Sequence, residues 1–202
     1  MSKGLLIFGG IATFFVLVVF ILVMYFISTY NSMVTLNENA ETAWSQVENQ
    51  YQRRFDLIPN LVNTVKGYAT HEKSTFVEVT EARSKVSQIN LSAKDLNNPE
   101  MLAKFQAAQD GLSSALSKLM VVVEKYPELK ANENFKQLQD QLEGTENRIS
   151  VERRKFNNEC KSYNIKIKRF PANIIAGMFG FTERPYFQAK EGTEEAPKVE
   201  FN

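Results

Sequence analysis

Residues 5 to 27 form one uncharged and almost wholly apolar run, LLIFGGIATFFVLVVFILVMYFI, which limits what the chain can fold into more than any other feature. At about 1.5 Å of helical rise per residue, the run would be long enough to cross a bilayer core of roughly 30 Å. A cleavable signal peptide would have a shorter apolar region and a small-residue cleavage site. The sequence STYNS that follows matches such a site poorly. We therefore predict a retained transmembrane anchor over residues 5–27, preceded by a flank of residues 1–4.

The charges on either side of this run bear on its orientation. Lys3 and the terminal amine precede it, whereas Glu38, Glu41 and Glu48 follow it before the next basic residue, Arg53. Basic flanks favour the cytoplasmic side. We expect a single-pass protein of the bacterial inner (plasma) membrane, with a cytoplasmic N-terminus and a periplasmic or external domain. A basic stretch at residues 148–169, with 8 Lys and Arg against 2 Asp and Glu, leaves the reverse orientation open.

The remaining residues, about 175, suffice for one domain with a sizeable core. The only cysteine is Cys160, which excludes an internal disulfide, a paired-cysteine metal site and a lipoprotein anchor. The whole chain has 24 basic and 23 acidic residues, a balance that argues against nucleic-acid binding. We expect no cofactor and no metal.

Apolar residues recur every three or four positions in four stretches, which is the pattern of helices with one buried stripe. The stretches cover residues 40–69, 76–89, 102–123 and 135–170. Pro59 lies inside the first stretch, where we expect a kinked helix, with a junction of two helices as the alternative. Asn98 before Pro99 is typical of a helix N-cap followed by a first-turn proline. Pro171 is expected to stop the last helix.

Short breaks, including a turn marked by Pro127 and by residues 132–134, favour antiparallel neighbours. The sequence therefore predicts an all-α fold with an N-terminal transmembrane helix followed by an antiparallel up-down-up-down four-helix bundle over residues 37–170. Residues 28–36 would be a helical connection, continuous with the anchor because no Pro or Gly lies between Ile11 and Pro59. Residues 171–187 would dock on the membrane or the bundle, and residues 188–202 would form an acidic disordered tail.

Three stretches of sequence carry a resemblance to a known family. They are residues 43–86, which include RRFDLIPNLV, residues 126–164, and the pattern FP…FGF…RPYF in residues 170–187. In these stretches the chain resembles the LemA family of bacterial single-pass membrane proteins. The resemblance implies a membrane-anchored helical bundle and supplies no established catalytic activity. Magnetosome-associated proteins are similar to this family, and some members occur beside genes for a phosphatase-like domain or a membrane metalloprotease.

His71 is the only histidine, and Glu72 follows it between the first two predicted helices. The pair could act as a general base and the group that orients it. Alternatively, His71 closes one helix and Glu72 opens the next, as the helix dipole favours. The sequence favours the structural interpretation because no second histidine, HExxH motif, nucleophile elbow or P-loop accompanies the pair.

Arg54, Asp56 and Glu152 are the candidates for a polar core. Arg54 falls one residue from the first stripe and Glu152 lies within the fourth, so we expect an Arg–carboxylate pair inside the bundle that fixes its register. The alternative is a polar cluster with Arg53 and Asn60 that faces a ligand or partner. Trp44 and Cys160 are expected in the core.

The basic stretch leads into the apolar segment, and this pair of features suggests a surface for lipid or for another subunit. In the predicted topology the fourth helix returns toward the anchor, so its last cations would reach the height of the lipid headgroups. A solvated helix face is the alternative. The candidate interaction or membrane-proximal residues are Lys166, Lys168, Arg169, Phe170, Ile174, Ile175, Phe179 and Phe181.

No convergent set of catalytic groups emerges from the sequence, and we expect that the protein is not an enzyme. The predicted function is a non-catalytic membrane-anchored scaffold or adaptor that self-associates and contacts the lipid bilayer. The alternative is an accessory or regulatory subunit of an envelope protease or phosphatase-like enzyme.

Overall fold

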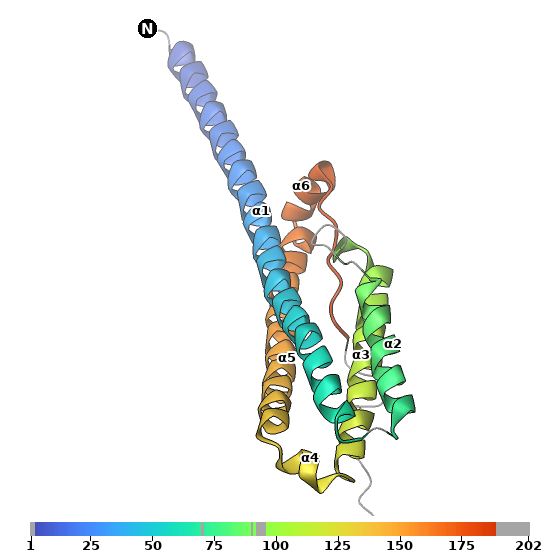
Figure 1. Ribbon diagram of the computed structural model, residues 1–202. Helices are drawn as coiled ribbons and strands as arrows, with labels where there is room; N and C mark the ends of the chain where they lie inside the picture. The colour runs from blue at the N-terminus through green and yellow to red at the C-terminus, as the bar shows by residue number, and fades with distance from the viewer. Residues whose placement is uncertain (1–2, 70, 90, 92–95, 189–202) are drawn as a thin grey trace, which may run out of the picture. The chain divides into compact units, whose positions relative to one another are not determined.

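The computed structural model of the chain describes residues 3–69, 71–89, 91 and 96–188, with side chains from residue 8 onward. The described residues contain six helices and no β-strand (Figure 1). The helices are α1 (Lys3–Lys66), α2 (Lys73–Ser87), α3 (Pro99–Val123), α4 (Pro127–Ala131), α5 (Glu133–Lys168) and α6 (Ala172–Phe179). The predicted all-α class with a long apolar N-terminal helix is confirmed.

Short polar residues and one glycine set several of the helix ends. The Asn98 side chain accepts hydrogen bonds from the backbone N–H groups of Glu100 and Met101, which confirms it as the N-cap of α3. Asn132 caps α5 in the same way by accepting from the Phe135 N–H at 3.0 Å. Gly180 ends α6 with a φ of 71°, a conformation that glycine adopts at low cost.

The apolar run and the first helix of the predicted bundle are one helix, as predicted, because α1 continues without a break from Lys3 to Lys66. Pro59 lies inside α1, so the alternative of two helices meeting there is wrong, while the kink stays a prediction. Every residue from 8 to 25 is exposed. Among the described residues, α1 is the one helix long and apolar enough to cross a membrane, and its most apolar window has a mean hydropathy of 2.8.

The chain divides into two compact units, and α1 and α5 each contribute to both. The first unit contains residues 1–42 and 158–183, and the second contains residues 43–157 and 184–202. The second unit contains a large apolar core to which α1, α2, α3, α4 and α5 contribute. Its largest buried side chains include Ile58 and Leu61 of α1, Phe76 of α2, Leu112 and Leu119 of α3, Leu129 of α4 and Phe135 of α5.

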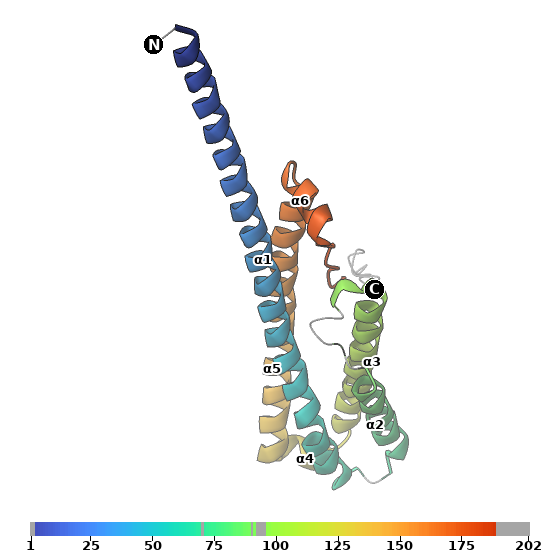
Figure 2. The same cartoon turned by 90° about the horizontal axis from the view of Figure 1, so that it is seen from above.

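Pairs of contacting residues define how the helices of the second unit run. Asn132 donates to the Tyr68 hydroxyl at one end of this unit, and Arg54 pairs with Glu146 farther along. As the residue number falls along α1, the number of the contacting residue in or next to α5 rises. The two helices therefore run antiparallel. Lys118 of α3 pairs with Glu78 of α2, and these two helices lie side by side in Figures 1 and 2.

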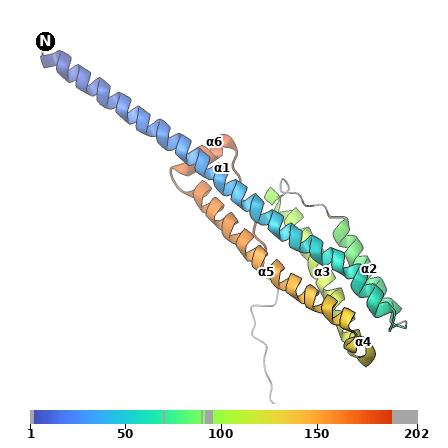
Figure 3. The ribbon, with the colours of Figure 1, turned by 60° about the vertical axis from the view of Figure 1, so that its left-hand side comes forward.

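In the first unit, α6 packs against α1 and the end of α5 (Figure 3). The shared apolar cluster contains Met33 of α1, Tyr163 and Ile167 of α5, and Ala172, Ile175 and Ala176 of α6. Phe26, Tyr30, Leu36 and Phe181 pack around it. One face of α6 is therefore packed against α1 and α5.

The structure refines two expectations from the sequence. The break at Pro127 contains the short helix α4, which starts at Pro127 because a proline suits the first helical turn. The fourth helix ends at Lys168, three residues before Pro171. The predicted disordered tail lies outside the described residues except for Gln188, and the segment bounds predicted above stay predictions.

Candidate functional site

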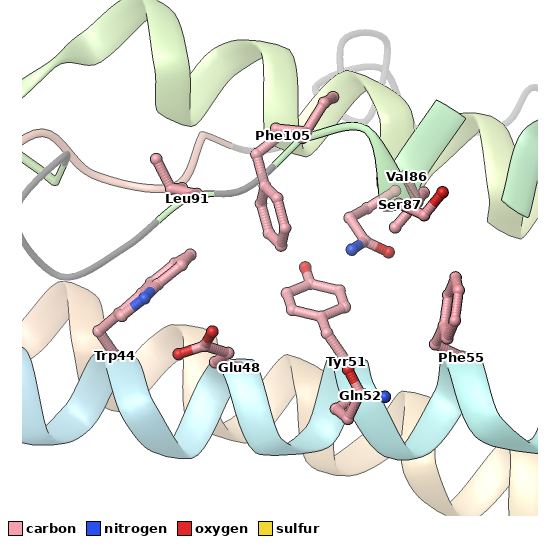
Figure 4. A pocket seen from close by; sticks show the side chains of 11 residues that line it. Trp44, Glu48, Tyr51, Gln52, Phe55, Val86, Ser87, Leu91 and Phe105 are labelled. Carbon is pink, nitrogen blue, oxygen red and sulfur yellow. The ribbon is translucent and has the colours of Figure 1, made fainter. Parts of the chain in front are cut away.

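A pocket of about 310 Å³ lies between α1, α2 and α3 in the second unit. Figure 4 shows Trp44 and Tyr51 projecting from α1 toward Leu91 and Phe105, and Phe55 projecting from α1 toward Val86 and Ser87. The edge of the Tyr51 ring meets Phe105, with 5.1 Å between the ring centroids. Aromatic rings therefore form part of the walls. The remaining lining residues are Glu48, Gln52, Val86, Ser87, Ile89 and Gln109.

The lining suits an apolar or aromatic guest better than a chemical reaction. Among the described residues that line the pocket, Glu48 is the only charged one, and Ser87 is accompanied by no histidine or lysine that could act as its base. Burial raises the pKa of the Tyr51 phenol above its ordinary value of 10.0, against the opposing effect of Arg153 and Arg54. Tyr51 is therefore neutral near pH 7 and is a weak candidate for proton transfer.

Arg54 is a buried charge of this unit, and only 1% of its surface is exposed. Its Nη1 donates to the Ser113 hydroxyl at 2.9 Å and to Glu146 Oε2 at 2.8 Å, and its Nη2 donates to the side-chain oxygen of Gln109. The Glu146 side chain is 53% exposed, so the ion pair reaches from the interior to the surface. The Arg54 guanidinium also lies 5.2 Å from the centroid of the Tyr51 ring.

The structure corrects the expected partner of Arg54. Its carboxylate is Glu146, whereas Glu152 lies farther along α5 and pairs with Lys155 at 2.8 Å. The antiparallel register of α1 and α5 causes this difference, because it brings position 146 opposite position 54. Asp56 is exposed and accepts a hydrogen bond from Gln52, so it is not part of the polar core.

Trp44 lies in the core, as predicted, and its covering ring comes from a distant part of the sequence. Phe187 stacks on Trp44 with 5.9 Å between ring centroids, and Phe156 meets both rings edge-on. The backbone of Phe187 exchanges hydrogen bonds with the Asn157 side chain at 2.9 and 3.0 Å. Sequence reasoning missed Phe187 because it lies in an extended segment without a helical stripe. Its only signal was its place in the RPYF motif.

The other candidate residues have structural surroundings. Cys160 is buried, as expected of a small apolar side chain. His71 is exposed and does not close a helix, because α1 already ends at Lys66. Glu72 is the residue before α2, and its backbone oxygen accepts from the N–H groups of Thr75 and Phe76. No cluster of three metal-ligating side chains occurs within the part of the chain that the structure describes.

The predicted membrane-proximal residues all lie in the first unit. Phe170, Ile174 and Phe179 are exposed, whereas Ile175 is buried in the contact of α6 with α1 and α5, and Phe181 is half-buried against Tyr30 and Tyr163. Among the cations, Lys166 is half-buried and Arg169 is exposed. Lys168 pairs with Glu183 at 2.7 Å. The sequence therefore grouped residues that the fold separates into a packing face and an outward face.

With these features in view, the sequence was compared with known proteins. The model of the LemA family matches residues 43–201. The chain belongs to the LemA family. This assignment confirms the resemblance carried by residues 43–86, 126–164 and 170–187.

Several known proteins are similar to this chain over most of its length. Magnetosome protein MamQ 2 of Paramagnetospirillum magneticum is 31% identical over 188 residues, which cover 83% of this chain and 69% of that protein. Magnetosome protein MamQ of Magnetospirillum gryphiswaldense is 29% identical and covers 80% and 65%, respectively. Protein LemA of Metamycoplasma hominis is 26% identical over 178 residues, or 88% of this chain and 77% of that protein. None of these names denotes an enzyme.

Proposed function

We propose that this LemA family protein is a non-catalytic scaffold or adaptor, anchored in the bacterial inner membrane by residues 5–27 and self-associating there. The observation that carries the proposal is the first half of α1. Its side chains from residue 8 to residue 25 are apolar yet exposed, and a run of this length suits a bilayer core. The same helix continues into the second unit, so the anchor is part of the folded protein.

The chemistry of the second unit supports a binding role. Arg54, a buried charge of this unit, is engaged by Ser113, Gln109 and Glu146, and no acid–base pair occurs among the described residues that line the aromatic pocket. Interactions of this kind fix how helices pack, and they do not activate a nucleophile or a water molecule. A helical unit held at a membrane surface suits the task of bringing other proteins together.

The experiment that tests this proposal is chemical crosslinking of the full-length protein in native membranes, followed by mass analysis. We expect crosslinked products made only of copies of this chain. A crosslinked product that contains this chain and an envelope protease or phosphatase in a fixed ratio would contradict self-association as the main role. It would support the second candidate below. If only the uncrosslinked monomer is found at every crosslinker concentration, both the self-associating scaffold and the accessory subunit are contradicted.

An accessory subunit of an envelope enzyme is the second candidate, and the pocket between α1, α2 and α3 favours it. A cavity of about 310 Å³ lined by Trp44, Tyr51, Phe55 and Phe105 can accept an aromatic or aliphatic side chain of a partner. The Phe105→Ala variant would remove one wall. Loss of an enzyme from the crosslinked products of this variant, with self-crosslinks kept, would identify the pocket as the contact.

We further propose that the second unit lies on the periplasmic or external side. Val121 is exposed in α3 and can be replaced by cysteine without disturbing the core. A membrane-impermeant maleimide should label Val121→Cys on intact spheroplasts. Labelling only after lysis would reverse the orientation.

A further inference from the structure

We infer that the outward face of α6, together with Phe170, lies in the lipid headgroup and upper acyl region beside the anchor. This inference rests on the membrane location proposed above and adds a second lipid contact. The α6 helix has the sequence ANIIAGMF, in which Asn173 is the only polar side chain. Ala172, Ile175 and Ala176 are buried against α1 and α5, whereas Ile174 and Met178 point outward and are exposed.

The contacts within the first unit set the height of α6 relative to the apolar run. Met33 of α1 shares an apolar cluster with Ile167 near the end of α5. Met33 is six residues beyond the end of the run at residue 27, a distance of about 9 Å along the helix. Each interfacial layer of a bilayer is roughly 5 to 7 Å thick, from the difference between its total and hydrocarbon thicknesses. The end of α5 therefore falls at the outer edge of that layer.

The α6 helix extends from this level toward the hydrocarbon core. Near its start, Ala172 shares the cluster that contains Met33. At its other end, Phe179 meets Phe26 and Tyr30 of α1, with 5.8 and 4.8 Å between ring centroids. Phe26 belongs to the membrane-crossing run itself. The outward face of α6 is thus continuous with the surface of α1 that we place in lipid.

The chemistry of this face favours lipid over water or a folded partner. Phe170 is 76% and Met178 is 68% exposed, and large apolar side chains gathered in this way rarely face water in a monomer. The exposed Arg169 directly precedes Phe170, and Lys166 lies three residues earlier. Cations and aromatic rings at the boundary of an apolar segment are typical of interfacial anchoring.

The test measures where single residues lie in the bilayer, using the full-length chain reconstituted into vesicles of phosphatidylcholine and phosphatidylglycerol. Met178→Cys and Ile174→Cys are made in a Cys160→Ala background and labelled with a nitroxide. Collision with oxygen, which concentrates in lipid, is compared with collision with a water-soluble nickel chelate. We expect both labels to collide with oxygen at least threefold more often than with the chelate.

Two matched positions separate the possible failures. Phe15→Cys, in the predicted span, reports the anchor, and Val121→Cys, which replaces a 66% exposed apolar residue of the second unit, reports water. If position 15 is in lipid while positions 174 and 178 behave like position 121, the α6 contact is wrong and the anchor stands. If position 15 is also aqueous, both proposals fail. Protection of positions 174 and 178 from both reagents would mean that protein covers this face, which overturns the lipid assignment.

Discussion

The α1 helix carries apolar side chains along most of its length, but the two halves place them in different surroundings. From residue 8 to residue 25 the helix is apolar all round and exposed, as Phe15 illustrates with 67% of its surface accessible. From Ala40 to Val65 only one stripe is apolar, and its members, such as Trp44 and Ile58, are buried. The comparison teaches that a helix that is apolar on all sides suits lipid, whereas a helix with a single apolar stripe suits packing on a protein core.

The largest expected effect comes from making the first half of α1 resemble the second in polarity. Val16→Lys combined with Val19→Lys puts two charges near the middle of the run, each at a cost of about 3 kcal/mol for insertion. We expect the protein to leave the carbonate-washed membrane fraction. Val77→Lys combined with Val121→Lys, at exposed positions of the second unit, should leave it in place. If both double variants stay in the carbonate-washed membrane fraction, the two halves of α1 do not differ in their need for lipid.

The next largest effect should come from Arg54 in the second half of the helix. Arg54→Glu replaces a buried cation with a second anion beside Glu146, and breaking such a pair costs about 3 to 5 kcal/mol. Chemical unfolding of the purified protein in detergent should show this loss. Arg53→Glu makes the same change at the exposed neighbouring position and should cost less than 1 kcal/mol, or about the value of a surface ion pair. An Arg54→Glu protein as stable as Arg53→Glu would show that Arg54 serves a partner instead of the fold.

The aromatic cluster should respond next. Phe187→Ala removes the ring that stacks on Trp44 and should cost about 3 kcal/mol. Because Trp44 is the only tryptophan, its fluorescence emission should shift to the red as water reaches it. Phe170→Ala deletes the same ring from an exposed site and should leave the emission unchanged. An unchanged spectrum in Phe187→Ala would show that this stacking does not shield Trp44.

A smaller effect is expected at the start of α3. Asn98→Ala removes the acceptor for the N–H groups of Glu100 and Met101 and should lower the stability of the second unit by about 1 kcal/mol. Asn97→Ala, one residue earlier and also exposed, is the matched control. Thermal unfolding followed by circular dichroism measures both, and equal midpoints would mean that the cap is energetically unimportant.

The smallest effect should appear only in alkali. Because burial raises the pKa of Tyr51, the folded protein keeps the phenolic proton at a pH where the unfolded chain releases it. The corresponding stability is fully present below pH 10.0, the ordinary pKa, and is lost as the pH rises through the higher folded-state pKa. Tyr51→Phe should therefore lose less stability than the wild type above pH 10.0, whereas Tyr68→Phe, at an exposed position, should follow the wild type. Parallel curves for all three would argue against a buried phenol at Tyr51.

Local sequence signals predicted the helical elements well because they act over a few residues. Asn98 and Pro99 marked the start of α3, and the absence of Pro and Gly between Ile11 and Pro59 indicated one continuous helix. The expected turn at Pro127 proved to contain the five-residue helix α4, whose pattern is too short to distinguish from a turn. The apolar segment after Pro171 was recognised, but its helical form in α6 was not.

Contacts between distant residues were predicted less well because they depend on register. The pattern indicated a buried arginine at position 54, yet Glu146 and Glu152 were both available on the predicted fourth helix, and only the packing of α1 on α5 selects Glu146. The aromatic pocket escaped prediction for the same reason, since Phe105 belongs to another helix. Phe187 had no periodic neighbours that could signal its burial.

The stacking of Phe187 on Trp44 also constrains the order of events during synthesis. Trp44 belongs to the first helix made, and Phe187 follows all six helices in the chain. A ribosome that has produced α1 to α5 therefore carries a nascent protein whose tryptophan still lacks its cover. The aromatic core of the second unit can therefore form completely only late in translation. A chain released before Phe187 is made would expose an apolar surface around Trp44 to chaperones and proteases.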